Sequence, residues 1–236
     1  MAKKYEGKAK IVEEQEGKDG LVKVIFKDST TAGNGEKKAD FANKGACCAE
    51  ISSILFEYLK DQGVTSHYVG REGTEAFIAR KVDIVPLEVV IRNIAAGSIC
   101  RRTGLTKGTV FNGPIVEYYY KDDDLGDPLL NRDHIDALGV ADNEDLAVMR
   151  DCALRANEEL SKLFADVGLK LVDIKFEFGR DGCELLLADE ISPDTCRLWD
   201  GDRSLDKDVF RRGDGSPVSG YEEVLNRLRK VTEKGA

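Results

Sequence analysis

The chain has 236 residues, 42% of them apolar and 33% charged, and its 35 basic and 44 acidic residues give a net charge of −9. This length fits one large domain or two lobes around a shared cleft. The excess of acidic residues argues against non-specific nucleic-acid binding. No apolar run approaches the ~20 residues needed to span a bilayer, which argues against membrane insertion. Six cysteines without CxxC spacing and only two histidines argue against a zinc site, so we expect a cytoplasmic protein with reduced thiols.

The N-terminal third predicts a β-rich layer and one helix. Residues 5–26 are expected to form strands around Gly7 and a turn at 17–20. Residues 41–62 predict a helix, because apolar side chains recur at helical spacing before the stop at Gly63. Residues 76–81 predict a strand, and the Pro-containing segment 83–86 is the candidate crossing between lobes. We therefore expect an N-terminal lobe over 1–83 and a C-terminal lobe over 84–236.

The second lobe mixes strands and helices. Residues 87–91 predict a strand that ends at Arg92, and a long helix is expected from Asn143 to Gly168. The alternation over 172–178 predicts a strand, with a four-residue turn at 179–182 and an antiparallel return over 183–188. A last helix is expected around 221–231. Strands followed by a helix in each half favour an α+β fold over a doubly wound sheet.

Four segments carry groups that suit anionic ligands. In the segment Tyr5–Lys10, Gly7 lets backbone amides approach a phosphate while Lys8 and Lys10 point to one side. The alternative is a solvated, lysine-rich edge strand, and no Walker A motif is present. The polar loop 27–37 offers hydroxyls and glycines for an anion, although its Asn34-Gly35 pair alone is typical of a tight turn.

The third segment, residues 88–98, delivers Arg92 from a strand and then opens onto Gly97-Ser98, so a guanidinium, a hydroxyl and exposed amides could hold a phosphate or carboxylate. The alternative is a surface arginine beside a turn of small residues. In the fourth, Tyr118–Pro128, Lys121 could meet a phosphate, although an acidic run is usually a solvated loop.

The acidic ribbon from Val172 to Glu190 is the strongest signal. Asp173, Lys175 and Glu177 share one face of a strand, and the returning strand runs into Asp189 and Glu190. Like charges on one face repel unless a cation is present, and carboxylate oxygens are what Mg²⁺ prefers, so we expect a metal site. The four-residue turn would place Asp173 near Asp189. A metal shared by Glu177 and Asp189 therefore requires a bent, offset or shorter hairpin.

Taken together, these segments resemble one enzyme family. The order YEGKAK, DSTTAGNG, VPLEVVIRNIAAGS, LVDIKFEFG and DEISPDTCRLWD is similar to the SAICAR synthetase (phosphoribosylaminoimidazole-succinocarboxamide synthase) family, from about Tyr5 to the C-terminal helix. The resemblance implies a two-lobed α+β fold with an ATP cleft between the lobes, related to ATP-grasp enzymes and more distantly to protein kinases. It also implies a homodimer.

The resemblance implies an ATP- and Mg²⁺-dependent ligase of purine biosynthesis. ATP would activate the carboxylate of carboxyaminoimidazole ribonucleotide (CAIR), and the amine of L-aspartate would attack it to form an amide, giving SAICAR, ADP and phosphate. The other readings are a different ATP-dependent phosphotransferase with a kinase-like cleft and a non-catalytic nucleotide-sensing module.

The resemblance also implies roles for individual residues. The nucleotide would be bound by Gly7, Lys8, Lys10, Lys81, Val85, Leu87 and Glu88, and magnesium by Glu177 and Asp189. The ribonucleotide would be bound by Arg92, Ser98, Asp173 and Arg197. The groups implied in catalysis are Lys10, Lys121, Asp173 and Lys175.

Overall fold

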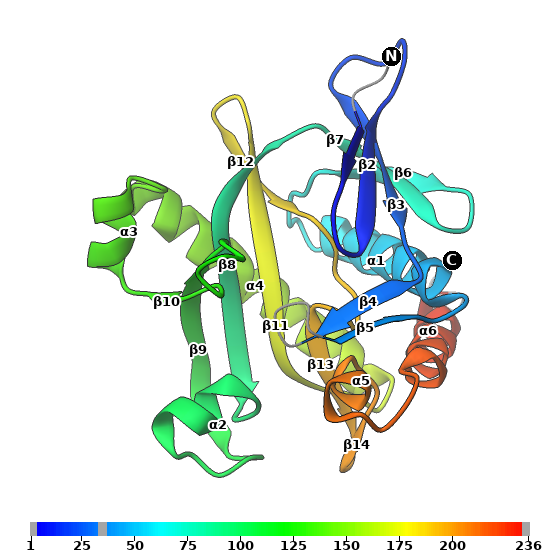
Figure 1. The fold of residues 1–236 in the computed structure, drawn as a ribbon, viewed down its shortest axis with the longest axis vertical. Helices are drawn as coiled ribbons and strands as arrows, with labels where there is room; N and C mark the ends of the chain where they lie inside the picture. Colours follow the sequence, from blue (N-terminus) through cyan, green and yellow to red (C-terminus); the bar gives the residue numbers. More distant parts are fainter. Residues whose placement is uncertain (1–3, 33–36, 233–236) are drawn as a thin grey trace.

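The computed structural model describes residues 4–32 and 37–232, and the ribbon shows two sheets with helices packed behind them (Figure 1). The smaller, five-stranded sheet has the order β1-β2-β3-β7-β6, and all its pairings are antiparallel. Its strands are β1 (Lys4–Glu6), β2 (Lys10–Glu14), β3 (Leu21–Phe26), β6 (Tyr68–Glu72) and β7 (Ala76–Arg80).

Helix α1 (Lys44–Asp61) covers one face of this sheet. In β3, Val22, Val24 and Phe26 are buried while the residues between them are half-buried, so the strand expected within residues 5–26 is confirmed here. A small hairpin of β4 (Ser29–Ala32) and β5 (Lys37–Asp40) precedes α1.

The seven-stranded sheet holds the second lobe together, with the order β10-β9-β8-β11-β13-β14 and β12 paired to β11. Its strands are β8 (Asp83–Ile94), β9 (Val110–Tyr120), β10 (Leu129–Leu130), β11 (Lys170–Asp181), β12 (Glu184–Ala188), β13 (Cys196–Asp200) and β14 (Arg203–Ser204). The segment 83–86 is the start of β8 rather than a separate linker, because its backbone pairs with Gly179 and Arg180 of β11. The crossing between sheets is therefore confined to Lys81 and Val82.

The remaining helices are α2 (Ser98–Thr103), α3 (Arg132–Leu138), α4 (Asn143–Asp166), α5 (Asp208–Arg212) and α6 (Val218–Thr232). Helix α4 begins with a capping box between Asp142 and Asp145 and packs against β8, β11 and β12. Helices α4 and α6 both contact α1, and one hydrophobic core extends from β3 through α1 and α4 to α6. The two-lobed α+β fold expected from the sequence is confirmed.

One edge of β11 is shared by two strands, which creates the main feature of the site. Strand β13 pairs with the first half of β11 and β12 with the second half. The loop 189–195 bridges the gap, and Lys175 N–H of β11 donates to Thr195 O of this loop at 2.9 Å. The segment richest in carboxylates is thereby held beside the middle of β11.

The expected four-residue turn at 179–182 is wrong. Strand β11 continues to Asp181, which pairs with Glu184 across a two-residue turn in which Gly182 has φ 60°. Glycine accepts this left-handed conformation without a Cβ penalty. The pairing therefore shifts, and Glu177 lies opposite Ala188, next to Asp189. The turn is shorter than the sequence pattern indicated and the register is offset, which removes the geometric difficulty of a shared metal.

Candidate active site

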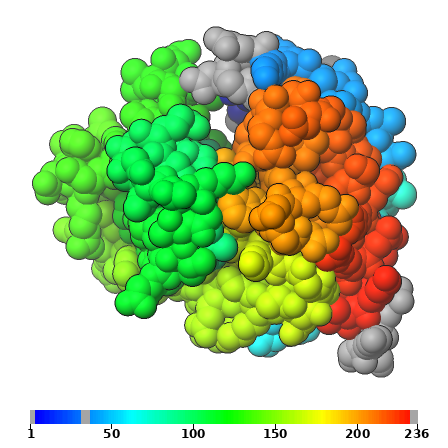
Figure 2. All heavy atoms as spheres, turned by 90° about the horizontal axis from the view of Figure 1, so that it is seen from below, coloured from blue at the N-terminus to red at the C-terminus, as the bar shows by residue number. Residues whose placement is uncertain are grey.

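Two adjoining cavities lie on the face of the seven-stranded sheet away from α4, and the first also lies against the five-stranded sheet, on the face that packs against α1. The first is about 710 Å³ and is lined by β1–β3, by the start of β8 and by the end of the β11–β12 ribbon. The second is about 350 Å³ and lies toward β13 and α5. A hollow is visible from below between the green α2–β9 side and the orange α5 side of the molecule (Figure 2). The residues that line both cavities are Lys8, Thr31, Glu88, Asp127, Lys175, Asp194, Thr195 and Lys207.

The first cavity has one apolar and one charged wall. Its apolar residues include Val12, Val22, Val24, Val82 and Ile84. The charged wall comes from β11 and from the loop after β12. There Lys175 Nζ lies 2.7 Å from both Glu88 Oε1 and Glu177 Oε1, and Lys121 also pairs with Glu177. An apolar wall facing such a charged wall suits a ligand with a flat base and a polyanionic tail.

Lys10 connects the N-terminal sheet to this wall. Its Nζ lies 2.6 Å from Asp189 Oδ1 and 2.7 Å from Glu190 Oε1. Ser192 Oγ donates to the other oxygen of Glu190 at 2.6 Å, so the carboxylate is held from both sides. Because Lys10 lies on β2 and its partners follow β12, these ion pairs join the two lobes across the cavity.

Glu177 and Lys10 carry full charges at neutral pH. Burial would raise the pKa of Glu177, but Lys175, Lys121 and Lys10 together hold it well below its usual range. Burial would likewise lower the pKa of Lys10, but Asp189, Glu190 and Glu177 raise it above its ordinary value. The ammonium and carboxylate groups therefore sustain one another in a largely buried site.

The residues present fit a magnesium ion. Glu177 and Asp189 contribute hard carboxylate oxygens to one cavity, and Mg²⁺ is usually bound by one or two carboxylates together with phosphates and waters. A second group, Cys48 with Glu190 and Asp194, brings ligand atoms within 4.8 Å of one another. It fits Mg²⁺ poorly, because burial raises the pKa of the Cys48 thiol well above its ordinary value and Lys44 Nζ already lies 2.7 Å from Asp194 Oδ2.

The second cavity is built around two arginines that share one carboxylate. Arg92 Nη1 donates to Asp173 Oδ2 at 2.9 Å, and Arg197 Nη1 donates to the same oxygen at 2.7 Å. Arg92 Nη2 also donates to Ser98 Oγ at 3.0 Å, so the predicted Arg92, Ser98, Asp173 and Arg197 are brought together. Two fixed guanidinium groups beside a hydroxyl suit a phosphate or carboxylate ligand.

Both arginines are held by further partners. Arg92 Nε donates to Glu117 Oε2 at 2.6 Å, and Arg197 Nε donates to Asp208 Oδ2 at 2.8 Å. Gly97, with φ 62°, lies so close to Arg197 that a Cβ there would be 2.5 Å from the Nη2 atom. A glycine at 97 is therefore required both by the backbone and by the close approach of the guanidinium.

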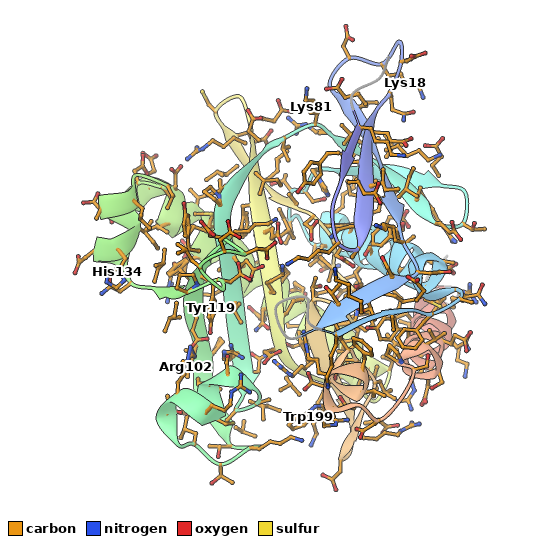
Figure 3. All side chains as sticks on the ribbon, in the orientation of Figure 1. Lys18, Lys81, Arg102, Tyr119, His134 and Trp199 are labelled. Atoms are coloured by element: carbon orange, nitrogen blue, oxygen red, sulfur yellow. The ribbon has the colours of Figure 1, made fainter. Side chains whose placement is uncertain are left out.

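Arg102 and Tyr119 extend the arginine network toward the surface, and both lie on the α2–β9 side (Figure 3). Arg102 Nη1 donates to the Tyr119 hydroxyl at 2.9 Å, and its other amino group pairs with Glu117. Glu117 was not singled out from the sequence, because it is a single acid directly before a run of tyrosines.

The other predicted residues are distributed as follows. Gly7, Lys8 and Lys81 line the first cavity. Lys8 pairs with Asp123 at 2.6 Å, and Lys81 pairs with Glu14 at 2.7 Å at the outer end of the cavity, where Figure 3 labels it near the top. The Gly33–Gly35 part of the expected anion loop lies outside the described residues.

Val85 and Leu87 do not line the cavity as expected. Both side chains are buried in the core, because alternate residues of β8 face opposite sides of the sheet. Val82 and Ile84 line the cavity instead, and Glu88 lies on the same side as Ile84. Only the backbone of Val85 and Leu87 remains available to a nucleotide.

Sequence reasoning also missed His67, which lines the first cavity, and Lys207, which lines both. Among the described residues, no carboxylate lies within ion-pair distance of Lys207. His67 is buried, and burial lowers its pKa to about 4 despite the nearby Asp189, so the ring is neutral. In the sequence, the segment before β6 that contains His67 shows no motif that would mark it as part of a binding site.

Comparison with known proteins decides the family. The model of the SAICAR synthetase family matches residues 3–228. The chain belongs to the SAICAR synthetase family. The phosphoribosylaminoimidazole-succinocarboxamide synthase of Finegoldia magna is 50% identical over 232 residues, which cover 97% of this chain and 100% of that protein.

Solved structures of family members share the fold. The crystal structure of phosphoribosylaminoimidazole-succinocarboxamide synthase from Ehrlichia chaffeensis has a TM-score of 0.92 at 42% identity and covers 95% of this chain and 97% of that one. A structure described as SAICAR synthetase (Type-2) in complex with ADP has a TM-score of 0.91 at 44% identity, covering 96% and 97%. The SAICAR synthetase family suggested by the sequence motifs is thus confirmed over nearly the whole chain.

Proposed function

We infer that this protein is an ATP-dependent carbon–nitrogen ligase of purine biosynthesis, which joins L-aspartate to the carboxylate of CAIR and produces SAICAR, ADP and phosphate. Family membership over residues 3–228 carries this inference. The site supports it, because a cavity suited to a nucleotide adjoins a smaller cavity suited to a second anion. Two reacting anions could therefore meet along one wall.

In the first cavity, the apolar wall and the backbone of β8 are proposed to bind the adenine. Gly7, Lys8 and Lys10 of the β1–β2 hairpin are proposed to contact the phosphates, with Lys81 at the outer end. Binding there places new anions beside Lys10 and Lys121, whose present partners are Asp189 and Glu177. The lysines are thus already in place to exchange a carboxylate for a phosphate.

Glu177 and Asp189 are proposed to hold Mg²⁺ together with the phosphates. When bound, the ion would neutralise charge on the phosphates and on the transferring phosphoryl group. Lys175 and Lys10 orient Glu177 and Asp189 through direct ion pairs, and the neighbouring lysines keep the pKa of Glu177 well below its usual range.

In the second cavity, Arg92, Ser98, Asp173 and Arg197 are proposed to bind CAIR. A carboxylate is a poor electrophile because its oxygen is a bad leaving group, and phosphorylation makes that oxygen a good one. The chain's part in this step is to orient the CAIR carboxylate toward the nucleotide and to stabilise the negative charge that develops, with Lys175 on the wall between the cavities. Lys121 is proposed to approach the phosphates or the L-aspartate.

The test is ADP release with ATP and Mg²⁺ when CAIR and L-aspartate are omitted in turn. We expect sustained turnover only when both are present, with SAICAR as the product. Full turnover without L-aspartate would contradict the ligase and favour a phosphotransferase that acts on a hydroxyl. ATP binding without turnover under every condition would favour a nucleotide-sensing module.

Three further expectations belong with this proposal. We propose that the protein acts in the cytoplasm as a homodimer, and the described residues contain no helix long and apolar enough to cross a membrane. Sedimentation equilibrium tests the dimer, and a single species near 26.0 kDa would contradict it.

The lobe boundary at residue 83 is supported by the change from one sheet to the other between β7 and β8.

A further inference from the structure

Asp189 has a backbone conformation unusual for a residue with a side chain. Its φ is 63°, in the left-handed region that glycine favours and that aspartate adopts more often than most other residues. Such a conformation persists only where its surroundings hold it, and it concentrates at functional sites. Asp189 is also a proposed magnesium ligand, so the cause of this conformation bears on the site.

The left-handed backbone decides which way the carboxylate points. Glu177 and Ala188 lie opposite one another in the ribbon, so their side chains share one face of the sheet. If Asp189 continued β12 in an extended conformation, its side chain would lie on the opposite face from Ala188 and Glu177. The reversal at Asp189 allows its carboxylate to enter the cavity that also contains Glu177 and to meet Lys10 at 2.6 Å.

His67 contacts the backbone of this residue directly. Its Nε2 atom lies 3.1 Å from Asp189 O. A carbonyl oxygen can only accept, so Nε2 carries the proton and donates it. The side chain of His67 lies on the cavity wall beside Asp189, with only 4% of its surface exposed. The hydrogen bond is therefore sheltered from competing water.

The ring of His67 is itself held firmly. It packs edge-on against Phe56 and Phe77, with both centroid distances 5.7 Å. The His67 N–H donates to Leu187 O at 2.8 Å, and the His67 carbonyl accepts from Arg80 N at 2.7 Å. The first of these hydrogen bonds joins the His67 backbone to β12 at Leu187, two residues before Asp189. The Nε2–H group of His67 therefore has a fixed position relative to Asp189.

We propose that His67 is a positioning residue: its Nε2–H···O bond to Asp189 holds the left-handed backbone that turns the Asp189 carboxylate toward Glu177. The inference rests on the proposed function, in which these two carboxylates bind Mg²⁺ and the nucleotide phosphates. His67 itself contacts neither ligand in this scheme. Its effect passes through the backbone of Asp189 alone.

The test compares His67→Leu, which removes the donor, with His67→Gln, whose amide nitrogen can occupy the place of Nε2. ADP affinity is measured by titration calorimetry with Mg²⁺ and with EDTA, and melting temperature is recorded for each variant. We expect His67→Leu to lose about 10–100-fold of the Mg²⁺-dependent affinity, as when the partner of a metal ligand is removed. Its affinity in EDTA should stay within about twofold of the parent, and His67→Gln should retain the Mg²⁺ effect.

Where Mg²⁺ strengthens ADP binding in the parent, an equal strengthening in His67→Leu would overturn the proposal, and so would equal losses in the Leu and Gln variants. If His67→Leu does not fold, His67→Asn replaces it, because its amide is one methylene too short to reach the Asp189 carbonyl.

A crystal structure of the donor-free variant separates this inference from the proposed function. We expect the backbone of Asp189 to leave the left-handed region in that variant. An unchanged φ with the carboxylate still facing Glu177 would overturn the positioning role, even if Mg²⁺ proved not to strengthen ADP binding in the parent. Failure to form SAICAR would contradict only the proposed function.

Discussion

At the scale of single residues, the site is a set of buried charges, each paired with a side chain of opposite charge. Glu177, Asp189 and Asp173 each have a basic partner within 3 Å in the structure. A buried charge without a partner is costly, so each partner stabilises the fold as well as the site. The sequence indicated these residue types and their order, but it could not indicate that two arginines share Asp173, because that depends on how β8 and β13 flank β11.

Asp189→Asn should lower turnover on the order of a hundredfold or more, because it removes a charged metal ligand whose contribution is several kcal/mol. The fold should remain intact, since asparagine also tolerates the left-handed backbone that Asp189 adopts. ADP release and melting temperature measure the two effects. Asp202→Asn, on the exposed turn between β13 and β14, serves as the matched control. Parental turnover in Asp189→Asn would refute the metal role.

Arg92→Ala should reduce the free energy of unfolding by about 3–5 kcal/mol, because Asp173 and Glu117 would lose a buried partner. Arg92→Lys keeps the charge but loses the planar fork, so it should raise the KM for CAIR with a smaller loss of stability. Urea unfolding and initial rates measure these changes. The exposed pair Arg212–Asp214 gives a control, since Arg212→Ala should cost less than about 1 kcal/mol. A parental KM in both Arg92 variants would show that Arg92 does not bind CAIR.

At the scale of elements, the ribbon of β11 and β12 shows what sequence patterns could and could not supply. Alternation from Val172 to Phe178 correctly predicted the strand and the face that carries Asp173, Lys175 and Glu177. The pattern did not fix the register, because Gly179 and Gly182 are both acceptable turn residues and the choice depends on pairing with β8. Strand β9 was not predicted either, since its tyrosines are only half-buried at the side of the sheet.

Gly179 provides a test of how the ribbon meets the crossing between lobes. A Cβ at this position would lie 2.3 Å from Cγ2 and 2.7 Å from Cβ of Val82, which lines the first cavity. Gly179→Ala should therefore cost about 1–3 kcal/mol through overpacking and raise the KM for ATP by displacing Val82. Denaturant unfolding and kinetics measure both. Adding Val82→Ala should restore part of the lost stability and of the raised KM. If the double variant is no better than Gly179→Ala alone, overpacking against Val82 is not the cause.

At the scale of the whole molecule, two sheets share one hydrophobic core but enclose a charged interface. Length and composition allowed either one large domain or two lobes, and the family motifs distributed from β1 to β13 indicated two lobes that both contribute to one site. The position of α6 against α1 was not predictable, because an amphipathic helix shows only that it packs, not where. That contact ties α6 to the N-terminal lobe.

The charged interface makes stability depend on pH. Burial would raise the pKa of Asp208, but Arg197 and Arg211 lower it to about 2, and Lys207, Lys44 and Tyr221 likewise outweigh burial to lower the pKa of Asp194 to about 2. A lowered carboxyl pKa contributes stability that is present above about pH 4 and is lost as the pH falls toward 2.

We therefore expect the free energy of unfolding to fall steeply between pH 4 and pH 2, by about 2 kcal/mol for Asp208 alone. Urea midpoints across this range measure the fall. Asp208→Asn should flatten the curve by that amount, and an unchanged slope would show that Asp208 does not titrate as its partners indicate.

The central claim is that both lobes gather a nucleotide and CAIR around a divalent ion held by Glu177 and Asp189. The most direct measurement is a crystal structure with ADP, CAIR and Mn²⁺, in which anomalous scattering locates the metal. The expected result is a metal peak bonded to both carboxylates, with the nucleotide in the first cavity and CAIR beside Arg92 and Arg197. A metal bound elsewhere, with both carboxylates still paired to Lys10 and Lys175, would contradict the claim.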